Sequence, residues 1–157
     1  MLAYDFQKYC GADFEIIGMD RNKLDIISLE QVRNVIAQIK PNIILNCAAY
    51  TDVDEAEDTG KLINFQVNAL GVYHLAKVAK ELNCDLITIS TDYVFDGVPP
   101  CHSEHSEASN TSRQGYLPND ICNPINTYGM AKYLGEELAK AELPSTIIVR
   151  TSWLYGG

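Results

Sequence analysis

Short, almost wholly apolar runs alternate with longer segments of helical periodicity along this chain of 157 residues. The short runs have the composition of strands and lie at 14–19, 43–46, 86–90 and 146–150. Helical patterns follow at 28–39, where Ser28 and Gln31 are placed as in a capping box, and at 62–82 and 127–141. Strands that alternate with helices predict a parallel sheet covered on both faces, and therefore a protein of the α/β class.

Length and charge narrow the range of functions. The chain is long enough for one domain with a real core and too short for two ordinary domains. Its net charge of −9 argues against a nucleic-acid surface, which needs clustered Lys and Arg, although helix amides can still hold an anionic small ligand. No apolar run approaches the roughly 18 residues of a membrane span, and residues 1–10 lack the features of a signal peptide. We therefore expect a cytoplasmic protein without nucleic-acid or membrane partners.

Two segments contain metal-ligand residue types, but neither predicts a metal site. The polar stretch 98–123 has no period and reads as a long exposed loop; its Cys101, His102 and His105 lack a second cluster that would complete a four-ligand site. The acidic run 52–58 is better explained as a solvated helix start, where carboxylates favour the helix dipole. The five cysteines are irregularly spaced and are expected to be free thiols, with Cys47 and Cys84 buried.

The pattern Tyr128-x-x-x-Lys132 lies on a predicted helix, so that both side chains project from one face. A phenol with a pKa near 10 is a poor acid-base catalyst at neutral pH unless a neighbour stabilises its anion. A lysine ammonium one turn away does that and can also bond a ribose hydroxyl. The alternative is an ordinary surface helix, because this spacing is common.

Other candidate residues follow predicted strands, where open α/β sheets bind their ligands. Thr91 comes after the run 86–90 and could bond a substrate carbonyl or alcohol oxygen; the alternative is a helix cap or a strand-end turn. Small residues at 47–49 would let the backbone approach a ligand closely. Asp20 follows the run 14–19, where a carboxylate can accept from an adenosine ribose hydroxyl.

In this order, the motifs resemble those of the extended short-chain dehydrogenases, and within them the dTDP-4-dehydrorhamnose reductase family. The resemblance covers nearly the whole chain and is carried by MDRNKLDI, KPNIILNCAAYTDVDEAE, VNALGVYHLAKVAKE, STDYVFDG, NPINTYGMAKYLGE and VRTSWLYG. It implies a Rossmann-type doubly wound parallel sheet that reduces the 4-keto group of a dTDP-linked deoxysugar with hydride from NADPH or NADH. It also implies a homodimer for the full-length enzyme.

The resemblance gives roles to individual residues. Tyr128 would donate the proton, and Lys132 would lower the pKa of Tyr128 and hold the nicotinamide ribose. Thr91 would polarise the keto oxygen, with Asp92 beside it at the sugar. Trp153 would contact the substrate, the alternative being a buried aromatic after a strand. The cofactor contacts would be Asp20, Asp25, Ile26, Ala49, Tyr50 and Thr51, together with Tyr128 and Lys132.

The chain departs from the family at both ends. Members begin with a central strand and a glycine-rich turn that holds the pyrophosphate, whereas no GxGxxG-type fingerprint occurs here. The sequence also stops before the family's substrate-binding region. We therefore expect residues 1–157 to form an incomplete NAD(P)-binding domain that by itself binds dinucleotide poorly and is inactive. The loop 98–123 is longer than in the family, which leaves the fit of the sugar open.

Two other functions compete with reduction. An epimerase or dehydratase on the same scaffold would place acidic residues directly after the strand-end threonine, whereas Asp92 here is followed by the aromatic and apolar residues YVF. A non-catalytic nucleotide-binding module is favoured by the missing ends and disfavoured by the intact Thr91, Tyr128 and Lys132. The choice between NADPH and NADH stays open, because Asp20 favours an unphosphorylated ribose and Arg21 could pair with a 2′-phosphate.

Overall fold

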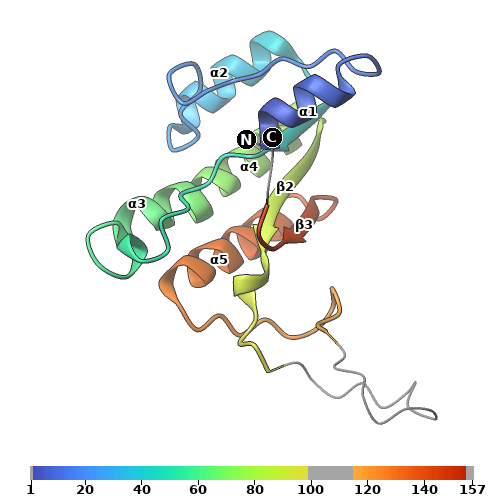
Figure 1. Ribbon diagram of the computed structural model, residues 1–157. Helices are drawn as coiled ribbons and strands as arrows, with labels where there is room; N and C mark the ends of the chain where they lie inside the picture. The colour runs from blue at the N-terminus through green and yellow to red at the C-terminus, as the bar shows by residue number, and fades with distance from the viewer. Residues whose placement is uncertain (1, 99–114, 155–157) are drawn as a thin grey trace, which may run out of the picture.

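The computed structural model describes residues 2–98 and 115–154 (Figure 1). Its α-helices in these ranges are α1 (Leu2–Cys10), α2 (Leu29–Ile39), α3 (Lys61–Phe65), α4 (Val72–Leu82) and α5 (Thr127–Glu142). Its strands in the same ranges are β1 (Ile43–Asn46), β2 (Asp85–Thr91) and β3 (Ile147–Thr151). Single turns of 3-10 helix form η1 (Glu55–Glu57) and η3 (Asp92–Val94), and a π-helical segment, η2 (Gln66–Gly71), joins α3 to α4.

The three strands form a parallel sheet in the order β1-β2-β3. The segment α3–η2–α4 connects β1 to β2, and α5 connects β2 to β3, so each crossover between parallel strands contains a helix. The predicted α/β class is therefore confirmed, and three of the four predicted strands lie within one residue of their expected positions. Because the strands are parallel, the residues that follow them gather at one edge of the sheet.

The predicted strand at 14–19 is wrong. This segment has no regular secondary structure and pairs with no strand in the described part of the chain, and Phe14 and Ile17 are exposed. A strand exists only where a neighbour takes up its backbone hydrogen bonds, and in the described part of the chain no strand lies alongside 14–19. In the described residues, β1 pairs with β2 on one side and has no partner strand on the other.

The core lies between one face of the sheet and the helices α2 and α4. Its buried members include Val32, Ile36, Ile44, Leu75, Val78 and Leu86. On the opposite face Ile147 and Val149 remain 53% and 41% exposed, so the predicted helical cover is present on only one face in the ranges that the structure describes. In Figure 1 α4 and α5 run side by side next to β2, which agrees with their extensive mutual contacts.

Two of the predicted helices are confirmed with added detail. Ser28 caps α2 by accepting from the Gln31 amide at 3.3 Å, although the Gln31 side chain accepts from the Asp25 amide rather than from that of Ser28. The helix predicted at 62–82 runs from Lys61 to Leu82 and contains the π-helical segment η2. A Cβ added at Gly135 of α5 would lie 2.1 Å from the carbonyl oxygen of Asn68 in η2, so the two backbones touch and glycine is required there.

Two expectations drawn from composition can be compared with the structure. Cys84 is buried as predicted, whereas Cys47 is only half-buried because its strand has already ended. The described cysteines (Cys10, Cys47, Cys84 and Cys122) are free thiols. Among residues 2–98 and 115–154, no helix has both the length and the apolar character needed to cross a membrane.

Candidate active site

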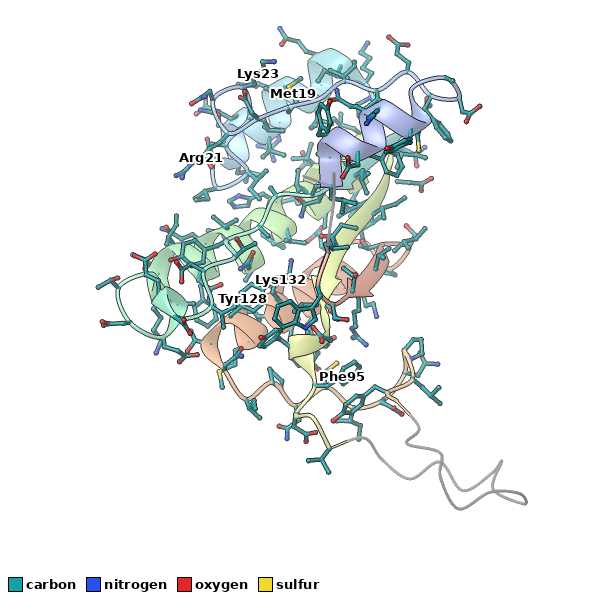
Figure 2. The ribbon with its side chains drawn as sticks, in the orientation of Figure 1. Met19, Arg21, Lys23, Phe95, Tyr128 and Lys132 are labelled. Atoms are coloured by element: carbon teal, nitrogen blue, oxygen red, sulfur yellow. The ribbon has the colours of Figure 1, made fainter. Side chains whose placement is uncertain are left out.

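Tyr128 and Lys132 lie on the first two turns of α5, on the side that faces the end of β2 (Figure 2). The helix begins where the Asn126 side chain accepts from the Gly129 amide at 2.7 Å, which satisfies one of the free donors of the first turn. Both side chains are buried, with Lys132 only 5% exposed. The alternative of an ordinary surface helix is therefore wrong for these two positions.

Lys132 carries its charge in a poorly solvated place. Its Nζ donates to the carbonyl oxygen of Ile89 in β2 at 2.7 Å. Burial lowers the pKa of this ammonium to about 8, and the negative charge of Glu136 opposes that shift. The group is therefore mostly protonated at neutral pH. An ammonium has three donors, so after the bond to Ile89 it can still donate to a ligand hydroxyl.

The phenol of Tyr128 has a raised pKa. Burial is the main cause; a hydrogen bond with the Thr91 side chain lowers the pKa, and the charges of Asp92 and Tyr93 raise it. The expected lowering by Lys132 is not found, because the ammonium is directed at the Ile89 carbonyl. A raised pKa keeps the phenol protonated at neutral pH, which suits a proton donor.

Thr91 ends β2 and also caps η3. Its Oγ1 accepts from the Tyr93 amide at 3.2 Å and donates to the Asp92 carboxylate at 3.1 Å. The alternative predicted from sequence, a cap at the strand end, is thus confirmed, and the same side chain acts to lower the pKa of the Tyr128 phenol. The ring of Tyr93 meets that of Tyr128 edge-on, with centroids 5.7 Å apart.

The start of α5 is held by Glu57 of η1, a residue that the sequence analysis did not single out. Its carboxylate accepts from the amide and from the hydroxyl of Thr127, both at 2.6 Å, and these bonds lower its pKa. Asn64 adds a bond from its Nδ2 to the Thr127 carbonyl at 3.0 Å. No local spacing could reveal a contact across 70 residues, although the sequence analysis did note the acidic run 52–58 that contains Glu57.

In the described ranges, no group of three or more ligand-type side chains is placed to hold a metal.

The backbone after β1 is fixed by hydrogen bonds from two asparagine side chains, and two of the residues in this segment are exposed. Asn46 donates to the Thr88 hydroxyl at 3.0 Å and accepts from the Ala48 amide at 3.1 Å. Asn68 bonds both the amide and the carbonyl of Tyr50, at 3.1 and 2.9 Å. The predicted contacts Ala49 and Thr51 are exposed, so this backbone can meet a ligand at the sheet edge.

The Tyr50 side chain is occupied by a structural contact. Its hydroxyl donates to the Glu55 carboxylate at 2.5 Å, and this bond is the main reason that its pKa rises to about 12. The phenol is therefore no acid-base group at neutral pH.

The predicted adenosine-side residues form a turn and part of the core. Asp20 accepts from the amides of Asn22 and Lys23 through one carboxylate oxygen, at 3.0 and 3.1 Å. Asp25 accepts from the Ile27 amide at 3.1 Å, and Ile26 is buried.

This turn is separate from Tyr128 and Lys132. Figure 2 places Met19, Arg21 and Lys23 beside α2, well away from Tyr128 and Lys132. The structure thus brings Thr91, Asp92, Tyr128 and Lys132 together and keeps the Asp20 group apart.

Trp153 lies two residues after β3, at the same edge of the sheet as Thr91. It is 75% exposed and has a φ of 47°, the left-handed region that non-glycine residues seldom adopt. The alternative of a buried aromatic is therefore wrong. An exposed, strained aromatic at this edge is available to a ligand.

The sequence of this chain matches a known protein family. The profile of the family described as "RmlD substrate binding domain" matches residues 2–157. The chain belongs to this family. The RmlD-family chain is 38% identical over 144 residues to a dTDP-4-dehydrorhamnose reductase of Aggregatibacter actinomycetemcomitans, covering 91% of this chain and 44% of the relative. It is 38% identical over 147 residues to a dTDP-4-keto-6-deoxy-D-glucose reductase of Streptomyces niveus, covering 93% and 46%.

A solved structure supports the same assignment. The crystal structure of a dTDP-4-dehydrorhamnose reductase from Bacillus anthracis, in complex with NADP, superposes with a TM-score of 0.85 at 36% identity. The match covers 98% of this chain and 50% of that one. The RmlD-family chain thus spans about half the length of the relatives that it matches.

The residues fit a nicotinamide dinucleotide at one end. Lys132 has donors left for ribose hydroxyls, and the exposed residues Ala48, Ala49 and Thr51 lie at the same sheet edge. The pyrophosphate end has no glycine fingerprint in these 157 residues.

Proposed function

We propose that the native gene product containing this chain reduces a dTDP-4-keto-6-deoxysugar, dTDP-4-dehydrorhamnose to dTDP-rhamnose, with NADPH or NADH. The observation that carries this proposal is the cluster of Thr91, Tyr128 and Lys132 at the carboxyl edge of a parallel sheet. The relatives named for this activity support it.

The chemistry assigned to the chain is a proton transfer coupled to hydride transfer. When bound, the nicotinamide supplies the hydride to the keto carbon. Tyr128 gives its phenolic proton to the keto oxygen as the C=O π bond breaks, so that a C–H and an O–H bond form. Thr91 bonds the same oxygen and fixes its position, and the Lys132 ammonium bonds the ribose.

The remaining residues are assigned to binding. Asp20, Asp25 and Ile26 would contact the adenosine half of the cofactor, and Ala49, Tyr50 and Thr51 the part nearer the sheet edge. Asp92 and Trp153 would contact the sugar, and the Trp153 side chain is exposed for that purpose. Arg21 is exposed beside Asp20, which leaves both NADPH and NADH possible.

Reduction is favoured over epimerisation or dehydration on the same scaffold by one observation. The position after Asp92 holds Tyr93, whose ring packs edge-on against the Tyr128 ring. Dehydratases that resemble this family typically place acidic residues directly after the strand-end threonine, and the aromatic Tyr93 is not one. The substrate is thus proposed to be a dTDP-sugar that already carries its keto group. We also propose a cytoplasmic, homodimeric enzyme that does not bind nucleic acid.

The test uses the native gene product and a panel of dTDP-4-keto-6-deoxyhexoses. We expect oxidation of the reduced nicotinamide only when a keto sugar is present, together with formation of the 4-hydroxy product. A folded, cofactor-binding protein that oxidises no cofactor with any member of the panel would instead support the non-catalytic module.

A further inference from the structure

A third side chain continues the stripe that Tyr128 and Lys132 form on α5. Glu136 lies four residues after Lys132, which places it on the same helical face. The three residues meet three consecutive residues of β2 (Tyr128 with the Thr91 side chain, Lys132 with the Ile89 carbonyl, and Glu136 with the Ser90 hydroxyl). The end of β2 is therefore attached to α5 at each of three turns.

Glu136 is more deeply buried than its neighbours on this stripe, at 2% exposure. It accepts from Ser90 Oγ at 2.5 Å and from Arg150 of β3, whose Nη2 and Nε lie 2.6 and 3.0 Å from its oxygens. A buried carboxylate with bidentate pairing to arginine and a further hydroxyl donor is held in one geometry. It thus joins α5 to both β2 and β3.

Arg150 extends this network to the loops beside the site. Its Nη1 donates to the Pro118 carbonyl at 2.9 Å, and its guanidinium lies 5.2 Å from the ring centroid of Phe95. The Phe95 ring stacks on Tyr116 with centroids 4.1 Å apart and planes at 8°. Arg150 therefore holds both described flanks of the segment 99–114. Figure 2 shows Phe95 below Tyr128, next to the chain that leaves β2.

We propose that Glu136 is a positioning residue, which through Ser90 and Arg150 fixes the catalytic pair against β2 and the loop flanks that border the sugar. The catalytic role of Tyr128 and Lys132 rests on the proposed function. The contacts of Glu136 do not depend on that function, and neither does the first measurement below.

The charges around Glu136 make the proposal measurable. Glu136 raises the pKa of Lys132 against the effect of burial. It faces Arg150 from β3, Cys122 from the segment before α5, and Tyr133 from its own helix, with Glu137 and Lys140 nearby. The phenol of Tyr128 lies one turn before Lys132 on the same face. Replacing Glu136 by glutamine keeps its shape and removes the negative charge.

The experiment titrates Lys132 by NMR in protein carrying ¹³C-labelled lysine, with the signal assigned by its loss in Lys132→Arg. We expect Glu136→Gln to lower the pKa of Lys132 by about one unit, the effect of losing one nearby opposite charge. Glu81→Gln is the matched control, because Glu81 forms an exposed ion pair with Arg33 at 2.8 Å and its loss should leave Lys132 unchanged. An unchanged Lys132 in Glu136→Gln would overturn the proposal.

If Glu136→Gln fails to fold because Arg150 is left unpaired, Glu136→Gln/Arg150→Met removes both charges and serves instead. It should again lower the pKa of Lys132, and an unchanged value would contradict us. Amide exchange at 95–98 and 115–123 should quicken in either variant and stay unchanged in Glu81→Gln; slow exchange in the variants would overturn the positioning role.

Turnover gives a second and separate readout. In the native enzyme, Glu136→Gln should lower kcat and move the alkaline limb of the pH profile with the pKa of Lys132, while Glu136→Asp restores much of both. If Lys132 responds in NMR but no keto sugar is reduced by wild type, the proposed function fails and the role of Glu136 in positioning Lys132 stands. If turnover occurs and Glu136→Gln leaves its pH profile unchanged, the inference fails alone.

Discussion

At the scale of single residues, Lys132 shows how a site can oppose the stability of its own fold. Burial lowers its pKa to about 8, so at neutral pH the folded protein must keep a charge that the unfolded chain solvates better. Between pH 8 and the ordinary lysine pKa, the unfolded state binds more protons, and stability therefore rises with pH through that window.

We predict that Lys132→Met stabilises the protein at pH 7 by about 1–2 kcal/mol, after subtracting the lost bond to Ile89. This gain in stability should shrink as the pH approaches the pKa of an unperturbed lysine. Chemical denaturation of both forms at several pH values measures it. A destabilised Lys132→Met at pH 7 would show that the bond to Ile89 outweighs the cost of burial.

At the scale of elements, the first turn of α5 touches the backbone of η3. A Cβ added at Gly129 would lie 2.2 Å from the Tyr93 carbonyl oxygen. We predict that Gly129→Ala costs about 1–3 kcal/mol of stability and displaces Tyr128 from Thr91. Gly115→Ala is the control, since nothing lies within 4 Å of its added Cβ. The melting temperature and the turnover rate should both fall in Gly129→Ala and stay unchanged in Gly115→Ala. Equal values in the two variants would mean that η3 moves aside without a cost in stability.

The same turn depends on the Glu57 carboxylate. Its bonds to Thr127 lower its pKa, so the stability that it adds is present above the ordinary glutamate pKa and is lost as the pH falls through the lowered one. We expect Glu57→Gln to melt below wild type at pH 7 and the gap to close in acid. A pH-independent gap in melting temperature would indicate lost shape rather than lost charge.

At the scale of the whole molecule, the parts predictable from sequence were those set by local pattern. Periodicity sufficed for β1, β2, β3 and α5, because a short apolar run in a strand and an apolar face on a helix are both visible in the local sequence. The segment 14–19 failed because a strand depends on a partner elsewhere in the sheet. The Glu57–Thr127 bond had no local trace either, whereas Glu136 could have been found by its spacing from Lys132.

The raised pKa of Tyr128 was also beyond sequence reasoning. Spacing placed Lys132 beside it, but the direction of the ammonium depends on the Ile89 carbonyl, and the desolvation depends on tertiary packing.

The 157-residue chain on its own should bind NADPH weakly. It has no glycine fingerprint for the pyrophosphate, and in the described ranges one edge of β1 has no strand partner. Isothermal titration with NADPH and with NADH measures this. Micromolar binding by a monodisperse sample would mean that the residues at 46–51 and Lys132 hold a dinucleotide without that turn.

The central claim is that Tyr128 protonates a keto sugar while a reduced nicotinamide gives it hydride. The most direct measurement supplies the native gene product with NADPH that carries deuterium at both C4 positions of the nicotinamide and with dTDP-4-dehydrorhamnose, and reads the product by NMR. The account predicts deuterium at C4 of the sugar, with Tyr128→Phe slowing its appearance by a factor of about 10² to 10⁴ while cofactor binding is kept. Product without deuterium, or a Tyr128→Phe enzyme of nearly full rate, would contradict it.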